Sequence, residues 1–319
     1  MKQVVLLESY KKKNAYQFFF DWFEDAWQSR GGKKKKVTYT LSWTIRMIIS
    51  KFGLVFSIRL LKSRKKALLV LSAGYPSSFA FPFNYRYEII PFIWDCWPRY
   101  WFRLFKFIKS NKVKTLFITS SHVRDLIKEK FPNLNVYWIP EGINIHKYKR
   151  GDLLKNRPID LLELGRVMQP FHEQVINSGI INLKVHYYTK DNNLLFSSFD
   201  SLIEGLEKSK ITVSYPRCYT HPEMAGKVET LTQRYWECML SRTLIIGKAP
   251  EELVEFVGYN PVIEVDLDNV GSQLSMILEN IESYQEFVDK NFETALEKAS
   301  WENRISVIEE KLNQVGYTL

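Results

Sequence analysis

The feature that most constrains this chain is an alternation of short apolar runs with helical segments in its second half. The strand-like runs share β-branched and aromatic residues and lie at 159–165, 183–189, 210–216, 243–247 and 261–267. Helical spacing of apolar residues marks 199–208, 230–241 and 251–257, and the pattern is helical from about 268 onward. Strands and helices that alternate at this rhythm predict a parallel α/β sheet.

The first half shows the same alternation less regularly. Its strand candidates are 3–9, 67–74, 87–95, 114–121 and 134–142, and its helical candidates are 13–28, 41–61, 97–109 and 120–130. The polar segment 146–158 coincides with a change of charge. Residues 1–150 carry 29 Lys and Arg against 9 Asp and Glu, a net charge of +20, whereas 151–319 carry 16 against 26, a net charge of −10. The sequence therefore predicts two domains, 1–150 and 151–302, that face different partners.

Cysteine content and hydropathy narrow the class of protein. Cys96, Cys218 and Cys238 form no C-x-x-C pair, which favours reduced thiols in the cytoplasm. No apolar run approaches the roughly 20 residues that span a bilayer, and no signal-peptide core follows Met1. We therefore expect a soluble or peripheral protein.

The segment "ETLTQRYWE" (229–237) follows a predicted strand and a loop and opens a helix. Thr230 and Gln233 have the spacing of a capping box, so the helix is predicted to begin at Thr230. In a parallel α/β sheet, the crevice between a strand end and the next helix is where ligands bind. The free N–H groups and the dipole at such a helix start favour an anion such as a diphosphate.

Charged residues in this segment suggest what the anion belongs to. Arg234 in the first turn opposes the helix dipole, unless a bound anion lies in front of the helix. Glu229 and Glu237 lie about 12 Å apart along a helix and can accept hydrogen bonds from hydroxyls. A nucleotide sugar has hydroxyls at both ends and phosphates between them.

The Glu-x7-Glu spacing in a C-terminal α/β domain resembles the nucleotide-sugar glycosyltransferases of the GT-B fold, especially the family-4-like retaining enzymes. Three further segments look like parts of that family. They are the G-R turn in "LELGRV" (162–167), the exit from the first domain in "YWIPEGINIHKYK" (137–149) and the start of the final helix in "SWENRI" (300–305). The resemblance covers about 115–319 well and 1–114 poorly.

The resemblance implies two Rossmann-like domains that face each other across a cleft, with the C-terminal helix 303–319 crossing back to the first domain. It implies that Glu229 contacts hydroxyls of the donor sugar, that Glu237 binds the ribose and that Arg166 meets the diphosphate. Two positions depart from the family. The Lys that follows the G-R turn is absent, so that Lys227 is a candidate replacement, and the usual Gly at the end of the Glu-x7-Glu helix is Arg242.

Other candidate site residues carry less specific signals. Arg217 and His221, in the loop before Glu229, are candidates for donor contacts or are ordinary surface residues. Asp95 ends an apolar strand and is a general base if the enzyme inverts, an acceptor-binding group if it retains, or a helix cap. His122 begins a helix and is read as a surface residue, and the remaining histidines form no recognisable constellation.

The segment 97–114 interleaves aromatic with basic residues. Trp97, Trp101, Leu104, Phe105 and Ile108 share one helical face. This face belongs either to a core-facing helix or to an interfacial helix on an anionic membrane, where each basic residue adds about 1 kcal/mol. The charge of the first half favours the membrane.

We therefore predict a glycosyltransferase that moves a sugar from a nucleoside-diphosphate sugar to a hydroxyl of a lipid-linked or surface-polysaccharide acceptor, as in lipopolysaccharide or capsule synthesis. Retention is expected. The donor is the only small molecule expected, without a cofactor or metal, because Arg166, Arg234 and the helix start can neutralise the diphosphate. The expected location is cytoplasmic, peripheral on the inner face of the membrane. The alternatives are an inactive GT-B scaffold and a basic nucleic-acid-binding protein.

Overall fold

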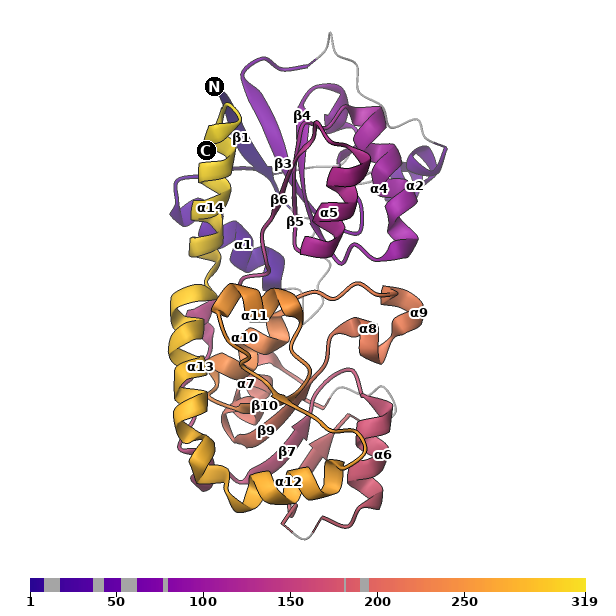
Figure 1. Ribbon diagram of the computed structural model, residues 1–319. Coiled ribbons are helices and arrows are strands. Elements are labelled where there is room, and N and C mark those ends of the chain that lie inside the picture. Colours follow the sequence, from indigo (N-terminus) through magenta and orange to yellow (C-terminus); the bar gives the residue numbers. More distant parts are fainter. Residues whose placement is uncertain (9–17, 37–42, 53–61, 77–79, 181, 190–194) are drawn as a thin grey trace. The chain divides into compact units, whose positions relative to one another are not determined.

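The computed structural model comprises residues 1–319 and describes all of them except 9–17, 37–42, 53–61, 77–79, 181 and 190–194 (Figure 1). The chain divides into two compact units. The first unit contains 1–140, 224–228 and 301–319, and the second contains 141–223 and 229–300. Residues 141–150, assigned above to the first domain, therefore group with the second unit.

The first unit is built on a parallel sheet with the order β12-β1-β3-β4-β5-β6, and β2 also pairs with β1. Its strands are β1 (Lys2–Leu7), β2 (Lys33–Lys35), β3 (Lys66–Ala73), β4 (Glu88–Trp94), β5 (Thr115–Ile118), β6 (Asn135–Trp138) and β12 (Tyr317–Thr318). The five strands predicted in this half are confirmed. The sequence reading missed β2 and β12, which are only three and two residues long.

Helices cover this sheet. They are α1 (Phe18–Ser29), α2 (Trp43–Lys51), α4 (Pro98–Asn111), α5 (Ser121–Lys130) and α14 (Trp301–Gln314), with a 3-10 turn at Phe83–Tyr85. The final helix α14 belongs to the first unit, as the family resemblance implied. Its Trp301 ring lies edge-on at 5.2 Å from Phe23, 6.3 Å from Phe92 and 5.9 Å from Trp94. Edge-to-face aromatic pairs add to the free energy of apolar burial, so α14 is an integral part of this core.

The aromatic face of α4 points toward the core of the first unit. Trp97, Leu104 and Ile108 are buried, and Trp101 and Phe105 are half-buried. The core-facing alternative is therefore correct for this face, and the basic residues of the helix lie on its exposed side. Phe102 also lies there and is 78% exposed.

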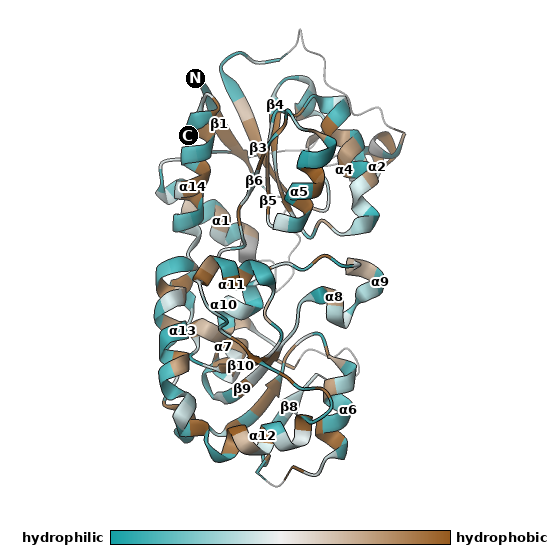
Figure 2. Ribbon diagram, viewed as in Figure 1, coloured by the Kyte–Doolittle hydropathy of each residue, from teal (hydrophilic) through white to brown (hydrophobic). Residues whose placement is uncertain are grey.

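The second unit contains a parallel sheet with the order β11-β10-β9-β7-β8. Its strands are β7 (Ile159–Glu163), β8 (His186–Tyr188), β9 (Ser209–Ser214), β10 (Leu244–Gly247) and β11 (Ile263–Glu264). They confirm the five predicted strands. Interior strands such as β3 are largely brown in Figure 2, as expected for parallel sheets that are covered on both faces.

The helices of the second unit are α6 (Gln169–Asn177), α7 (Phe199–Glu207), α8 (Arg217–Thr220), α10 (Gln233–Leu240), α11 (Glu251–Val257), α12 (Val270–Glu279) and α13 (Gln285–Lys298). Short 3-10 turns lie at Ile145–Lys147, Leu154–Asn156 and Ile281–Tyr284. The short helix α9 (Pro222–Ala225) begins in the second unit, and its last two residues group with the first. The sequence did not predict α6, because only two of its residues, Phe171 and Val175, are buried, which is too few for a recognisable apolar pattern.

Candidate functional site

Two segments of the second unit come together at the candidate site: the turn after β7 and the first turn of α10. Gly165 adopts φ +84°, and a Cβ atom at this position would lie 3.8 Å from Nη2 of Arg234. Glycine adopts this left-handed backbone without strain, so the turn passes close to the guanidinium. Arg166, the next residue, is exposed. The structure thus brings the predicted G-R turn beside the predicted Glu-x7-Glu helix.

The start of α10 differs from the prediction. The helix begins at Gln233 with Thr232 as its N-cap, and the capping box of Thr230 and Gln233 does not form. Instead, Gln233 donates from its backbone N–H to Oε2 of Glu141 at 3.3 Å and from its side chain to the carbonyl of Gly142 at 3.1 Å. Thr230 is buried two residues before the cap. The local capping signal was wrong because a distant segment of the same unit supplies these partners.

Two of the backbone N–H groups that we expected to bind an anion already donate hydrogen bonds to carboxylates of the protein. Besides the Glu141 contact at Gln233, the N–H of Leu231 donates to Oε2 of Glu252 at 2.8 Å. A carboxylate at a helix start is favourable for the same reason as a phosphate, because it meets the positive end of the dipole. A diphosphate at this site would therefore depend on side-chain donors more than on these two amides.

Glu237 and its neighbours form a partly buried polar group on α10. Glu237 is 9% exposed, and its Oε2 lies 2.9 Å from Nη1 of Arg234. Its Oε1 accepts a hydrogen bond from the hydroxyl of Tyr148 at 3.2 Å. Burial, with Glu237 alongside, raises the pKa of Tyr148 well above its usual value, so the phenol stays protonated and donates. Nη1 of Arg234 is buried and, although paired with Glu237, makes no well-aligned hydrogen bond within the described part of the chain, which leaves a donor for a ligand.

Glu229 lies in a different environment from Glu237. Its Oε1 accepts a hydrogen bond from Tyr219 at 2.9 Å, and its Oε2 accepts one from the N–H of Glu251 at 3.2 Å. Glu251 is the first residue of α11, so Glu229 caps that helix. Burial and the hydrogen bond to Glu229 raise the pKa of Tyr219 to about 12. Glu229 therefore stabilises the start of α11, independently of any contact with a ligand.

The other predicted residues are distributed over both units. Arg217 opens α8, and Nδ1 of His221 lies 3.1 Å from the hydroxyl of Thr220. In the first unit, Asp95 is exposed and follows β4 with a left-handed φ of 47°. Strained backbone at a non-glycine residue is a pointer to function. Lys227 is exposed, and a Cβ at its neighbour Gly226 would lie 3.2 Å from Pro98, so this segment lies beside the start of α4.

Arg242 explains one departure from the family pattern. It follows α10 with a left-handed φ of 52°, the conformation for which glycine is favoured. Its Nη1 donates to the carbonyl of Gly151 at 2.9 Å, and its guanidinium pairs with Asp289. The backbone conformation is therefore retained, and hydrogen bonds of the arginine offset its strain.

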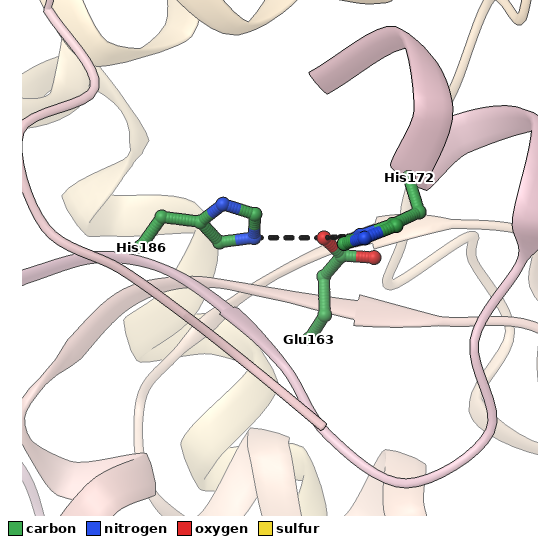
Figure 3. A group of neighbouring side chains, drawn as sticks. All are labelled: Glu163, His172 and His186. Atoms are coloured by element: carbon green, nitrogen blue, oxygen red, sulfur yellow. Dashed lines mark hydrogen bonds and ion pairs between the residues drawn. The ribbon is translucent and has the colours of Figure 1, made fainter. Parts of the chain in front are cut away.

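The sequence reading missed one group of residues altogether. Glu163, His172 and His186 point toward one another in the second unit (Figure 3). The expectation that these histidines form no constellation was wrong. The topology contains the missing signal, because Glu163 ends β7, His172 lies on the helix that follows it, and His186 begins the parallel neighbour strand β8.

Among the described residues, no helix combines the length and the apolar character that crossing a membrane requires.

Comparisons with known proteins agree on the fold. No protein-family model matches the chain, and no curated protein does. Sucrose-phosphate synthase from Thermosynechococcus elongatus is 12% identical, with 99% of both chains covered and a TM-score of 0.61. HepE from Anabaena, solved in complex with UDP and glucose, is 8% identical, with 98% of this chain and all of HepE covered and a TM-score of 0.59.

A third similar structure is that of TarM from S. aureus, solved as a mutant with Fondaparinux, alpha-GlcNAc-glycerol and UDP. It is 15% identical over 83% of this chain, with a TM-score of 0.53. The chain spans 57% of the length of TarM. With two parallel α/β units and a final helix that joins the first, the chain has the GT-B fold of the nucleotide-sugar glycosyltransferases.

Proposed function

We propose that this protein is a glycosyltransferase that transfers a sugar from a nucleoside-diphosphate sugar to a hydroxyl group. One observation carries the proposal: the partly buried group of Arg234, Glu237 and Tyr148 lies beside the turn at Gly165 and Arg166. Donors for phosphate and an acceptor for hydroxyls therefore meet in one unit. The fold agrees, and HepE has been solved with UDP and glucose.

Each residue in this group suits one part of such a donor. The guanidinium groups of Arg234 and Arg166 would neutralise the diphosphate through charge-assisted hydrogen bonds. Glu237 would accept hydrogen bonds from the ribose. Glu229 would accept from the sugar, since an ionised carboxylate has about four acceptor positions and Tyr219 and Glu251 use two.

The remaining candidates complete this assignment. Thr230, Arg217 and His221 would line the donor site, and Lys227 would replace the family's missing lysine. In keeping with the Glu-x7-Glu resemblance, we expect retention of the anomeric configuration and no metal ion at the diphosphate. Asp95 would then bind the acceptor hydroxyl.

For the acceptor we propose a lipid-linked or surface-polysaccharide precursor, bound by the first unit at the cytoplasmic face of a membrane. The exposed side of α4 combines basic residues with the 78% exposed Phe102. On α2, Ile45 and Ile48 are 45% and 49% exposed, and Phe52 just beyond it is 73% exposed. Apolar side chains among lysines and arginines are the composition that binds an anionic leaflet.

The donor assignment can be tested by thermal unfolding with a panel of nucleotide sugars. A ligand that binds only the native state raises the melting temperature. We expect one nucleotide sugar to stabilise the wild type, and Glu237→Gln and Arg234→Met to lose most of this shift relative to their own ligand-free midpoints. Glu204→Gln, which alters an exposed carboxylate on α7 of the same unit, should retain it. The proposal fails if no nucleotide sugar stabilises the wild type.

Turnover separates an enzyme from a scaffold of the same fold. With the stabilising donor and no acceptor, slow hydrolysis, in which water takes the sugar and the nucleoside diphosphate leaves, should be measurable for the wild type and strongly reduced for Glu237→Gln. Binding without release would favour the inactive scaffold. Salt-dependent binding to random DNA, with no response to any nucleotide sugar, would favour the nucleic-acid-binding alternative.

Co-sedimentation with lipid vesicles tests the membrane assignment. The wild type should bind anionic vesicles at low salt and dissociate as salt is raised, and Phe102→Ser should bind several-fold more weakly. Val307→Ser, at a 41% exposed apolar position on α14, serves as the control. Equal binding to neutral and anionic vesicles would contradict the proposed surface.

A further inference from the structure

Two imidazoles converge on one carboxylate at the carboxyl end of β7. Nδ1 of His172 lies 2.8 Å from Oε1 of Glu163, and Nε2 of His186 lies 2.7 Å from the same oxygen. The three potential ligand atoms all lie within 4.8 Å of one another. Figure 3 shows the rings approaching the carboxylate from two different elements, the helix α6 and the strand β8.

The second oxygen of this carboxylate is unusual. Oε2 of Glu163 is buried and has no hydrogen-bond partner in the part of the chain that the structure describes, and the side chain is only 3% exposed. A buried carboxylate with an unsatisfied oxygen is costly unless a cation or donor balances it. The hydroxyl of Tyr215 is also buried without a partner among the described residues. Burial and the nearby Glu163 raise the pKa of Tyr215, so its hydroxyl stays neutral.

We propose that Glu163, His172 and His186 bind a divalent transition-metal ion, with Zn²⁺ the best match. Two imidazole nitrogens and one carboxylate oxygen are a zinc ligand set that leaves a fourth position for water. Mg²⁺ and Ca²⁺ prefer oxygen ligands and are disfavoured by the imidazoles. The side chains of His172 and His186 are 18% and 12% exposed, which gives an ion access from solvent.

The side chains must rearrange to accept the ion, because the two imidazole nitrogens lie up to 4.8 Å apart and would have to approach to about 3.3 Å. Zinc binds nitrogen and oxygen at about 2.0–2.2 Å, so that tetrahedral ligands lie about 3.3 Å apart. The nitrogen–oxygen distances of 2.7 and 2.8 Å would therefore widen by roughly half an ångström.

Such an ion would join three elements around one turn. Glu163 lies at the end of β7, two residues before Gly165, and α6 begins at Gln169. Holding β7, α6 and β8 together would restrict the conformations of the 164–168 turn, which carries Arg166. The metal site does not depend on the proposed glycosyl transfer, but it would position a residue of the proposed donor site.

Metal titration tests the site directly. The chain would be purified with a chelator, dialysed and titrated with ZnCl₂ by calorimetry, and with CoCl₂ by visible absorption. We expect one equivalent to bind and to raise the melting temperature. Loss of a residue that merely supports a ligand weakens metal sites 10–100-fold, so removing a ligand itself in His172→Ala, His186→Ala or Glu163→Gln should weaken binding at least about a hundredfold. His122→Ala, an exposed histidine on α5, should bind like the wild type.

The Co²⁺ spectrum keeps the test valid if one variant folds poorly. An intense visible band reports tetrahedral nitrogen and oxygen ligands in the wild type, and its loss in either histidine variant assigns that ligand independently. The proposal is overturned if the wild type binds neither ion. It is also overturned if His172→Ala and His186→Ala bind as tightly as His122→Ala, because the metal would then lie elsewhere.

Discussion

The strands β4 and β7 occupy interior positions in the parallel sheets of the first and second unit, and they start alike. Glu88, the first residue of β4, accepts hydrogen bonds from Lys2 at 2.6 Å and Tyr317 at 2.9 Å. Asp160, the second residue of β7, accepts them from Lys210 at 2.6 Å and from the backbone N–H groups of Lys184 and Val185, both at 2.9 Å. Both strands thus begin with a buried carboxylate that a lysine neutralises.

Their carboxyl ends differ completely. β4 ends in Trp94, which packs against Phe92 and Trp301. β7 ends in Glu163, which faces two histidines. Ligands of open α/β sheets bind at carboxyl ends of strands, and these two strand ends provide a packed aromatic core in one unit and a polar site in the other. The fold provides the position, and the side chains at the strand end decide its chemistry.

The largest expected change in the free energy of unfolding concerns the aromatic packing at the end of β4. Trp301 is 1% exposed, and Trp301→Ala should lower the free energy of unfolding by about 4 kcal/mol, the usual range for removing a large buried aromatic. Urea denaturation measures the change. Phe102→Ala, at an exposed aromatic of the same unit, should stay within about 0.5 kcal/mol of the wild type. A small effect of Trp301→Ala would mean that this core does not depend on the final helix.

Asp160→Asn tests whether the start of β7 depends on charge. The change removes the ion pair with Lys210 and turns one acceptor into a donor that faces backbone N–H groups. We expect a loss of about 2 kcal/mol in the free energy of unfolding, typical of a buried charged hydrogen-bond network. Asp200→Asn, near the start of α7 in the same unit, is the matched control with little expected change. Equal stabilities of the two variants would contradict the prediction.

Left-handed backbone at non-glycine residues occurs in both units, at Asp95 and Lys112 in the first and at Arg242 in the second. Replacing Arg242 removes its contacts with Gly151 and Asp289, whichever residue takes its place. Arg242→Gly should nevertheless be more stable than Arg242→Ala by about 1 kcal/mol, because only alanine retains the steric penalty of positive φ. Denaturation of the two variants side by side measures this difference, and a more stable alanine variant would refute it.

The smallest effect concerns pH at the start of β4. Burial opposes ionisation of Glu88, but hydrogen bonds from Lys2 and Tyr317 outweigh it and hold the pKa of Glu88 below its usual value. A carboxyl with a lowered native pKa adds stability above its unfolded pKa of about 4.3, and this stability is lost as the pH falls through the native pKa.

The stability difference between the wild type and Glu88→Gln should therefore be largest near neutral pH and shrink in acid. Melting temperatures recorded from about pH 7 to pH 3 would show this trend, since the lost stabilisation follows proton uptake by the carboxyl. Glu310→Gln, at a surface carboxylate of α14, should differ from the wild type by an amount that changes little over the same range. A stability difference between the wild type and Glu88→Gln that grows as the pH falls would contradict this prediction.

The sequence supports a reliable reading of the strands and most helices, because apolar periodicity depends on which residues must be buried. It fails where the deciding partner is distant in the chain. The helix at 233 begins three residues later than its capping signal indicates, since Glu141 and Gly142 take the place of the local cap. The helix α6 has too few apolar residues to be recognised without the sheet beneath it.

The candidate site was predictable only in part. The spacing of Glu229 and Glu237 and the G-R turn identify the segments, and the structure brings Gly165 beside Arg234. Spacing alone assigns the two glutamates similar environments, whereas one caps α11 and the other is paired with Arg234 and Tyr148. The role of each glutamate depends on the side chains and backbone groups around it, and several of these belong to other helices and loops.

By itself, the sequence determined two α/β units of opposite charge, because burial patterns and net charge are properties of composition and order along the chain. Only the tertiary structure decided which polar groups are buried together. It joined Glu163 to His172 and His186, residues with no recognisable spacing, because parallel strands and their crossover helix bring separate segments to one end of a sheet.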